Sequence, residues 1–343
     1  MVRSRRTTAA VAVTGAETGL GTRLVSRLAA GERRVVAVSP TALALPEGVE
    51  PRVTADLDVA LAGAGVVVHL AASRDPARAA GARRTAIVAA TAEVLEAARD
   101  AGVRRVVLVT SAEVWQARPG QVPVPERAPL RAVDDASLVS DWLEVERLAD
   151  HARRTGLDVA VLRPATLVGL GPAEDGAVLR QLATTRLLAF RGVEPLWQLC
   201  HADDLVSALE VAVSSRLRGP CAVACEGWLP QTRVEELSGR RRLELPASVA
   251  VSTAERLHRL GVTAGSPSEL DALLVPVVVE PARLRSAGWS PTWTNEAALA
   301  EHLRLSSAPQ ERTTAYAAGA AGATAALLGT AALVRQARRR RRR

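Results

Sequence analysis

Residues 14–21 read Thr-Gly-Ala-Glu-Thr-Gly-Leu-Gly and lie between an apolar run, 9–13, and a segment whose leucines have helical spacing. In that context Gly15 permits a tight turn, Gly19 lets a phosphate approach the backbone, and Gly21 lets the helix pack closely on the strand. The helix N-terminus then offers free N–H groups to a pyrophosphate. We therefore predict a dinucleotide-binding loop, in preference to an ordinary glycine-rich turn.

Residues 9–163 alternate short β-branched runs with longer amphipathic stretches, a pattern typical of a parallel sheet covered by helices on both faces. The predicted strands are residues 9–14, 34–38, 65–70, 105–110 and 158–162. Two predicted helices carry apolar stripes, made of Leu20, Leu24 and Leu28 before Gly31, and of Ile87, Thr91, Val94, Leu95 and Ala98 before Gly102.

We therefore predict an α/β fold, a Rossmann-like doubly wound parallel sheet with a small C-terminal substrate lobe. Residues 8–165 form the predicted dinucleotide-binding domain. Residues 166–305 form the predicted lobe, interleaved with the last strands, and residues 306–343 are an Ala/Gly-rich tail that ends in arginines.

The charge of the chain is concentrated at its C-terminus. The net charge is +8, but Arg335 and the run 338–343 supply seven positive charges, which leaves +1 for residues 1–334. The chain has no lysine and eight aromatic residues, so stacking on single-stranded bases is not expected and nucleic acid is set aside as a partner. Cys200, Cys221 and Cys225 match neither a CxxC pair nor a zinc knuckle, so we expect a reduced cytoplasmic protein without a metal centre.

Residues 315–334 are an uncharged stretch of 20 residues, ten of them alanine, followed by the arginine cluster. That length matches the roughly 20 residues that cross a bilayer, and the arginines fit the cytoplasmic side. Ala, Gly and Thr insert weakly, so a low-complexity or surface-associated helix is the alternative to a membrane anchor. Membrane contact through residues 315–343 would tether the protein to the cytoplasmic face. At the N-terminus, a first strand is favoured over an export signal.

Further segments occur in the order found in one enzyme family. They are residues 56–58 (DLD), 68–72 (VHLAA), 94–98 (VLEAA), 109–115 (VTSAEVW), 125–126 (PE), 129–130 (PL), 162–164 (LRP), 201–205 (HADDL) and 287–291 (AGWSP). From about Thr8 to Leu305 the chain resembles the extended short-chain dehydrogenases/reductases, or NAD-dependent epimerases/dehydratases. The resemblance implies an NAD or NADP cofactor, a nucleotide sugar or other small-molecule ligand, and a homodimer formed through two helices of the sheet's outer face.

The resemblance also implies which residues contact the cofactor. They are Thr14, Gly15, Gly19, Leu20 and Gly21 in the loop, Asp56 and Leu57 at the adenine, Ala71 and Ala72 beneath the pyrophosphate and nicotinamide ribose, and Ser111. Ser39 stands where an acidic residue binds the adenosine ribose of NAD, and no arginine follows it for NADP, so cofactor identity stays open. Asp203 and Asp204 open a predicted helix and are interpreted as structural caps.

The family's catalytic pair is missing from this sequence. Family members place a Tyr and a Lys four residues apart on a helix, so that both face the nicotinamide and the ammonium promotes proton transfer by the phenol. This chain has no lysine, and its one tyrosine is Tyr316. With Glu146 as the alignment anchor, Leu138 takes the Tyr position and Trp142 the Lys position, while Ile87 replaces a helper Asn. Leu138, Trp142, Val145, Ala149 and Ala152 form a helical apolar stripe, which favours core packing for Trp142.

Two catalytic candidates remain. Ser111 matches the family's catalytic Ser or Thr, and Glu113 matches the Glu with which sugar dehydratases remove a proton, although Ala112 replaces the acid that accompanies it. The alternatives are a hydrogen-bonding structural role for Ser111 and an exposed or paired carboxylate for Glu113. The sequence thus predicts an NAD(P)-binding protein without standard oxidoreductase activity, in a cofactor-responsive binding or regulatory role. The alternative is a nucleotide-sugar epimerase/dehydratase-type enzyme that uses Ser111 and Glu113.

Overall fold

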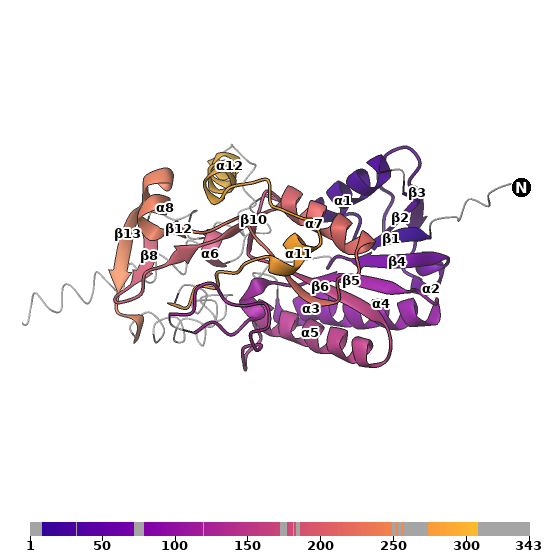
Figure 1. The fold of residues 1–343 in the computed structure, drawn as a ribbon, viewed down its shortest axis with the longest axis horizontal. Helices are drawn as coiled ribbons and strands as arrows, with labels where there is room; N and C mark the ends of the chain where they lie inside the picture. The colour runs from indigo at the N-terminus through magenta and orange to yellow at the C-terminus, as the bar shows by residue number, and fades with distance from the viewer. Residues whose placement is uncertain are drawn as a thin grey trace, which may run out of the picture.

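The fold is built on a seven-stranded parallel sheet in the order β11-β6-β5-β4-β1-β2-β3 (Figure 1). The computed structural model describes residues 9–31, 33–71, 79–118, 120–171, 177–180, 182, 186–248, 252, 256 and 274–307. The strands are β1 (Ala10–Thr14), β2 (Val35–Ser39), β3 (Glu50–Val53), β4 (Ala64–His69), β5 (Arg105–Val109), β6 (Asp158–Pro164) and β11 (Gly219–Val223). The chain runs outward from β1 to β3 and then returns to β4 on the other side of β1. This reversal is the doubly wound arrangement, and it confirms the predicted fold class.

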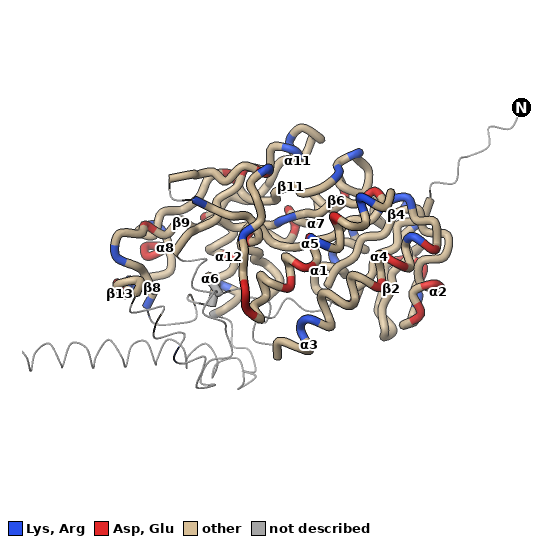
Figure 2. Tube along the Cα trace, turned by 90° about the horizontal axis from the view of Figure 1, so that it is seen from below, with Lys and Arg blue, Asp and Glu red and all other residues tan. Residues whose placement is uncertain are grey.

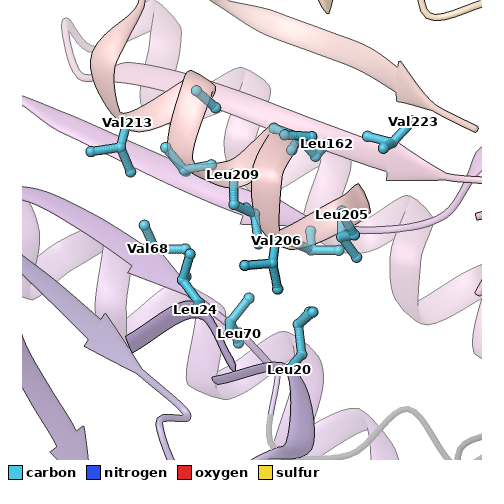
Figure 3. Packing of buried hydrophobic residues seen from close by; sticks show 14 of the residues in the cluster. Leu20, Leu24, Val68, Leu70, Leu162, Leu205, Val206, Leu209, Val213 and Val223 are labelled. Atoms are coloured by element: carbon cyan, nitrogen blue, oxygen red, sulfur yellow. The ribbon is translucent and has the colours of Figure 1, made fainter. Parts of the chain in front are cut away.

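Helices cover both faces of the sheet (Figure 1). The helices α1 (Gly19–Ala30), α7 (Ala202–Ser214) and α11 (Ala282–Ser286) lie on one face. The other face carries α2 (Leu57–Leu61), α3 (Ala80–Arg84), the π-helical η1 (Thr85–Ala89), α4 (Ala90–Asp100) and α5 (Leu138–Arg154). Figure 3 shows the first layer, in which Leu24 of α1 and Val206 and Leu209 of α7 pack toward Val68 and Leu162 of the sheet.

Both predicted apolar stripes are buried as expected. Leu20, Leu24 and Leu28 pack into the first core, and the N–H of Gly31 closes the end of α1 on carbonyls of its last turn. The second stripe packs into the other core, but Ile87 belongs to the π-helical turn η1 that precedes α4. The spacing of apolar residues was sufficient to predict the buried side of each helix, because each helix buries only one face.

Two strands of the main sheet were not predicted from the sequence, and both lie at its edges. In β3 the residues alternate between partly buried and exposed and include Pro51, while β11 begins Gly219-Pro220. Proline is tolerated in edge strands because one side of the strand needs no donor. Such short strands lack the β-branched run that marks a central parallel strand.

The C-terminal lobe extends beyond the carboxyl ends of the main strands. Its strands are paired as β7 (Thr166–Val168) with β10 (Leu199–His201), β8 (Arg186–Phe190) with β13 (Arg241–Leu245), and β9 (Leu196–Trp197) with β12 (Leu229–Pro230). The lobe's helices are α6 (Ala177–Arg180), α8 (Gln231–Ser238) and α12 (Asn295–Ser307). A separate apolar cluster around Leu179, Trp197 and Leu299 forms its core.

Charged residues are interspersed over the part of the chain that the structure describes (Figure 2). No helix among the described residues is long and apolar enough to cross a membrane. The predicted tail segment, residues 315–334, and the arginine cluster after it lie outside the described residues.

Candidate functional site

The glycine loop joins β1 to α1. At two of its glycines, backbone atoms of the protein leave no room for a Cβ. Gly15 has φ +73°, and a Cβ there would lie 2.2 Å from the carbonyl oxygen of Leu70. A Cβ at Gly21 would lie 2.2 Å from the carbonyl oxygen of Gly15. These contacts support the predicted roles of Gly15 in the turn and of Gly21 in close packing.

Gly19 has different surroundings. A Cβ there would meet Leu170 Cδ2 at 3.6 Å, which is ordinary contact, so the protein's own packing does not demand glycine. The helix is capped by Thr18. Its Oγ1 accepts a hydrogen bond from the Gly21 N–H at 3.0 Å and donates one to the carbonyl oxygen of Gly15 at 2.8 Å. The amides of Gly19 and Leu20 have no acceptor within a helix, because they belong to its first turn. A backbone that Leu170 does not crowd, together with these amides, fits a pyrophosphate.

Thr14 and His69 link the two strands that flank the reversal of strand order. Thr14 Oγ1 lies 2.7 Å from His69 Nδ1, and both side chains are buried. Burial lowers the pKa of His69 to about 4, so the imidazole is neutral at pH 7. Among the described residues its Nε2 has no hydrogen-bond partner. Thr14 therefore ties β1 to β4 directly before the loop.

Ser39, which stands at the place of the expected acidic residue, and the predicted cofactor residues Asp56, Leu57 and Ala71 follow the carboxyl ends of neighbouring strands. Ser39 ends β2, is buried, and accepts a hydrogen bond from the Thr41 N–H at 3.2 Å. Asp56 follows β3 and caps α2, since its Oδ1 accepts from the N–H groups of residues 58 and 59. Leu57 packs against the second core, as does Ala71, which follows β4. Ala72 lies outside the described residues.

Ser111 and Glu113 come directly after β5. Ser111 Oγ caps the short 3-10 helix η2 (Ala112–Val114) by accepting from the Glu113 N–H at 3.2 Å, which is a structural contact. Glu113 lines a pocket of about 40 Å³ between the edge of the sheet and the lobe. The sheet side contributes residues 112–113 and 165–166, and the other lining residues are Arg131, Val178, 195–198 and 276–277. That volume exceeds the roughly 10–15 Å³ that one water needs.

The predicted counterparts of the catalytic pair belong to the apolar interior. Trp142 is 2% exposed and Ile87 is fully buried, and both lie in the same core cluster. Leu138 is partly buried against that cluster. Core packing of Trp142 is thus confirmed, and these three positions hold no group that donates or accepts a proton.

The same helix carries a buried ion pair that the sequence analysis did not identify. Glu146 accepts hydrogen bonds from Arg163 Nε and Nη2 at 2.8 and 2.7 Å and from Thr110 Oγ1 at 2.7 Å. The Arg163 guanidinium also lies 4.5 Å from the ring centre of Trp115. The pair joins α5 to β6 beneath the segment that carries Ser111. Arg163, which follows the apolar run 159–162, is the signal that could have indicated the pair, whereas Glu146 is one of several charged residues of α5.

The capping role predicted for Asp203 and Asp204 is wrong in its detail. The N-cap of α7 is His201, whose Nδ1 accepts from the Asp203 N–H at 3.2 Å. Asp204 is buried and instead accepts from the N–H groups of Thr292 and Trp293 at 2.9 and 3.0 Å. These long-range partners explain the error, because a local capping rule does not include them.

Asp203 contributes to a link between α1 and the loop after β7. Arg23 of α1 donates to Asp203 Oδ1 and to the carbonyl of Gly169, each at 2.6 Å. His201 is held by Glu301 of α12, with Nε2 2.7 Å from Oε2, and stacks on Trp293 at 3.7 Å. The glycine-loop helix is therefore connected through side chains to the lobe.

Comparison with known proteins gives a consistent assignment. The model of the NAD dependent epimerase/dehydratase family matches residues 11–221. Uncharacterised proteins of Mycobacterium bovis and Mycobacterium tuberculosis are 28% identical over 246 residues, or 69% of this chain, which spans 65% of their length. A 3-diazoavenalumate denitrifying reductase from Streptomyces is 32% identical over 310 residues, covering 82% of this chain and 96% of that protein.

Among solved structures, MoeE5 in complex with UDP-glucuronic acid and NAD has a TM-score of 0.62 at 22% identity, covering 86% of this chain and 98% of MoeE5. At that identity the similarity concerns the fold. The family match covers most of the sheet and the glycine loop. The chain therefore belongs to the NAD-dependent epimerase/dehydratase family, whose cofactor is NAD or NADP.

Proposed function

We propose that this protein binds NAD or NADP at the glycine loop, lacks standard oxidoreductase activity, and serves as a cofactor-responsive binding or regulatory protein. The observation that carries the proposal is the contrast between the two halves of the site. The cofactor half keeps the glycine loop and the first-turn amides of α1, whereas the catalytic half holds Leu138, Trp142 and Ile87.

The cofactor half supplies a plausible position for each part of the dinucleotide. The amides of Gly19 and Leu20 would hold the pyrophosphate, Ser39 would face the adenosine ribose, and Asp56 and Leu57 would border the adenine. A bound nicotinamide would supply hydride transfer. The neutral hydroxyl of Ser39 neither repels a 2′-phosphate nor offers the carboxylate that favours NAD, which supports testing both cofactors.

The catalytic half argues against alcohol oxidation of the family's usual kind. Removing a hydride from a secondary alcohol requires a base for the hydroxyl proton, and the family uses a Tyr activated by a Lys. The chain has no lysine, so this activation is excluded by composition. The apolar side chains at the equivalent positions are packed into the core.

Isothermal titration calorimetry on the full chain tests the proposal. We expect binding of at least one of NAD, NADH, NADP and NADPH, and loss of that binding in Gly19→Ala without a decrease in melting temperature. A protein that binds none of the four contradicts the proposal. A change in amide hydrogen exchange on binding would support the cofactor-responsive role.

A second candidate is a nucleotide-sugar enzyme with substitute groups, favoured by the position of Glu113 in a pocket beside the sheet edge. Glu113 would accept a proton from the sugar, and the hydroxyl of Ser111 would donate a hydrogen bond to it. MoeE5 binds UDP-glucuronic acid and UDP-glucose, which are the first substrates to assay. Turnover that survives in the double variant Ser111→Ala, Glu113→Gln eliminates this assignment.

The Streptomyces relative suggests a variant of that candidate, a reductase whose acceptor needs no proton donor. An aryl diazonium ion carries its own positive charge, so hydride from NAD(P)H neutralises it without forming an oxyanion. The products are the arene, dinitrogen and NAD(P)+, which balances atoms and electrons. Oxidation of NADPH by benzenediazonium, faster with wild type than with Gly19→Ala, would support this reaction. Equal rates would contradict it.

Two further proposals concern assembly. Residues 315–334 and the arginines after them would tether the protein to the cytoplasmic face of a membrane, and the body would form a homodimer. The support for the tether is the uncharged stretch of 20 residues beside a cationic cluster. The support for the dimer is family membership.

A further inference from the structure

The glycine loop contains one carboxylate, that of Glu17, and one of its oxygens is buried without a partner. The residue as a whole is partly buried, and its Oε2 has no hydrogen-bond partner among the described residues. A carboxylate oxygen that is removed from water and receives no hydrogen bond is unfavourable. Nothing in the packing of the loop therefore explains an acid at this position. A hydrogen-bond donor on a bound ligand explains it.

The backbone places Glu17 beside the carboxyl end of β2. The Ala16 N–H donates to the Val38 carbonyl at 3.3 Å, so the loop leaves β1 in contact with β2. Glu17 directly follows Ala16, and Ser39 directly follows Val38. In a dinucleotide-binding fold the adenosine ribose is bound at the end of this second strand. Glu17 therefore brings to the expected ribose position the negative charge that Ser39 lacks.

Two arginines of the surrounding elements are already engaged by other groups. Arg52 is the register partner of Val38 on β3, and its side chain is 16% exposed. Its guanidinium donates to Glu50 and to the backbone carbonyls of residues 59, 60 and 62. Arg23 of α1 donates to Asp203 and to a carbonyl of the loop after β7. A phosphate group beside Glu17 would thus meet a carboxylate, while both arginines hold other acceptors.

We propose that Glu17 is the specificity residue of the cofactor site, where it accepts a hydrogen bond from the 2′-hydroxyl of the adenosine ribose and selects NAD(H) over NADP(H). An ionised carboxylate only accepts hydrogen bonds, which suits a hydroxyl donor, and its charge makes the bond roughly twice as strong as a neutral one. NADP carries a phosphate in place of that hydroxyl, with about −1.5 to −2 charges at pH 7, and the same carboxylate repels it. The inference rests on the proposed function, because it assigns the cofactor of the same site.

Calorimetry on the full chain with NAD and NADP, which differ only in the 2′-phosphate, tests the inference. We expect the wild type to bind NAD about tenfold or more tightly than NADP. Glu17→Gln keeps the size of the side chain and removes its charge. This variant should bind NADP about tenfold more tightly than the wild type does, and NAD a few-fold more weakly. Its melting temperature should not decrease, because no hydrogen bond of Glu17 Oε2 to the described residues is lost.

Two control variants separate the local charge from other effects. Glu93→Gln makes the same change in net charge at an exposed position of α4, on the other face of the sheet, and should leave both affinities unchanged. Glu17→Asp keeps the charge on a shorter side chain and should still bind NADP more weakly than Glu17→Gln does. If Glu17→Gln fails to fold, Glu17→Ala takes its place, with the same gain expected for NADP.

The outcomes distinguish this inference from the proposed function. A wild type that binds NADP as tightly as NAD overturns the inference and leaves the proposed function in place. A folded Glu17→Gln variant with the wild-type preference for NAD does the same. A protein that binds none of NAD, NADH, NADP and NADPH overturns both.

Discussion

Replacing Glu146 with Gln should destabilise the protein strongly, although the two side chains have nearly the same shape. The Glu146 side chain is 2% exposed and that of Arg163 is 5% exposed, so both charges are removed from water. Glu146 accepts two hydrogen bonds from Arg163 and one from Thr110. A carboxamide offers one acceptor oxygen and turns an NH2 group toward donors, which leaves the Arg163 charge buried and uncompensated.

The magnitude follows from the burial of the pair. Removing one partner of a buried ion pair costs about 3–5 kcal/mol, because the remaining charge is not resolvated. The matched control lies on the same helix, where Glu144 pairs with Arg147 at 2.5 Å and the Arg147 side chain is 68% exposed. Glu144→Gln should cost at most about 1 kcal/mol, since exposed pairs are screened by water.

Urea unfolding at pH 7, followed by tryptophan fluorescence and circular dichroism, measures both variants. A double variant, Glu146→Met with Arg163→Met, should lose less stability than the sum of its single replacements, because no unpaired charge remains. If Glu146→Gln unfolds within about 1 kcal/mol of Glu144→Gln, the pair does not have the buried, compensated character described here.

Three further outcomes are expected. Gly21→Ala should lower the melting temperature because its Cβ would lie 2.2 Å from a backbone oxygen, whereas Gly19→Ala should not lower the melting temperature and should lose dinucleotide binding by calorimetry. His69 has a folded-state pKa of about 4 against 6.5 ordinarily, so only the unfolded state takes up its proton between those values. Stability should therefore fall by about 3 kcal/mol as pH decreases through that window, and urea midpoints should show a shallower fall in His69→Asn. A chain ending at Ser307 should shift from the membrane to the supernatant fraction if residues 315–334 are an anchor, and identical fractionation of both chains would reject it.

The sheet and the glycine loop were predictable because their determinants are local. The five predicted strands correspond to β1, β2, β4, β5 and β6, each a short β-branched run that is buried on both faces. The turn at Gly15 and the close packing at Gly21 follow from residue type and spacing alone. Trp142 could be assigned to the core because the apolar stripe of its helix repeats with helical period.

Contacts between distant segments could not be predicted in this way. Asp204 binds residues 292–293, 88 or more positions away, so a local capping rule chose the wrong partner. Arg131 reaches the Glu113 pocket only because segment 129–131 pairs with 114–116. Neither segment has the β-branched or alternating pattern that predicts a strand. Their pairing therefore could not be predicted from the sequence.

The two halves of the site are physically separable, which explains how one can change without the other. The position of α5 depends on its apolar stripe and on the Glu146–Arg163 pair, and neither requires a Tyr or a Lys at positions 138 and 142. The cofactor loop depends instead on β1, β4 and α1. A protein without a Tyr and a Lys at positions 138 and 142 can therefore keep the framework of the predicted dinucleotide site.

Within that loop the three glycines do not carry equal information about a ligand. Gly15 and Gly21 are required by backbone atoms 2.2 Å from where a Cβ would lie, so a protein that binds nothing would still need them. Gly19 has ordinary room for a side chain, yet glycine at a helix position costs up to about 1 kcal/mol relative to alanine. The proposed cofactor binding accounts for that choice, since a pyrophosphate that approaches the backbone at Gly19 needs the absence of a side chain. Gly19 is thus the residue on which the case for cofactor binding rests, and Gly19→Ala is the replacement that separates binding from folding.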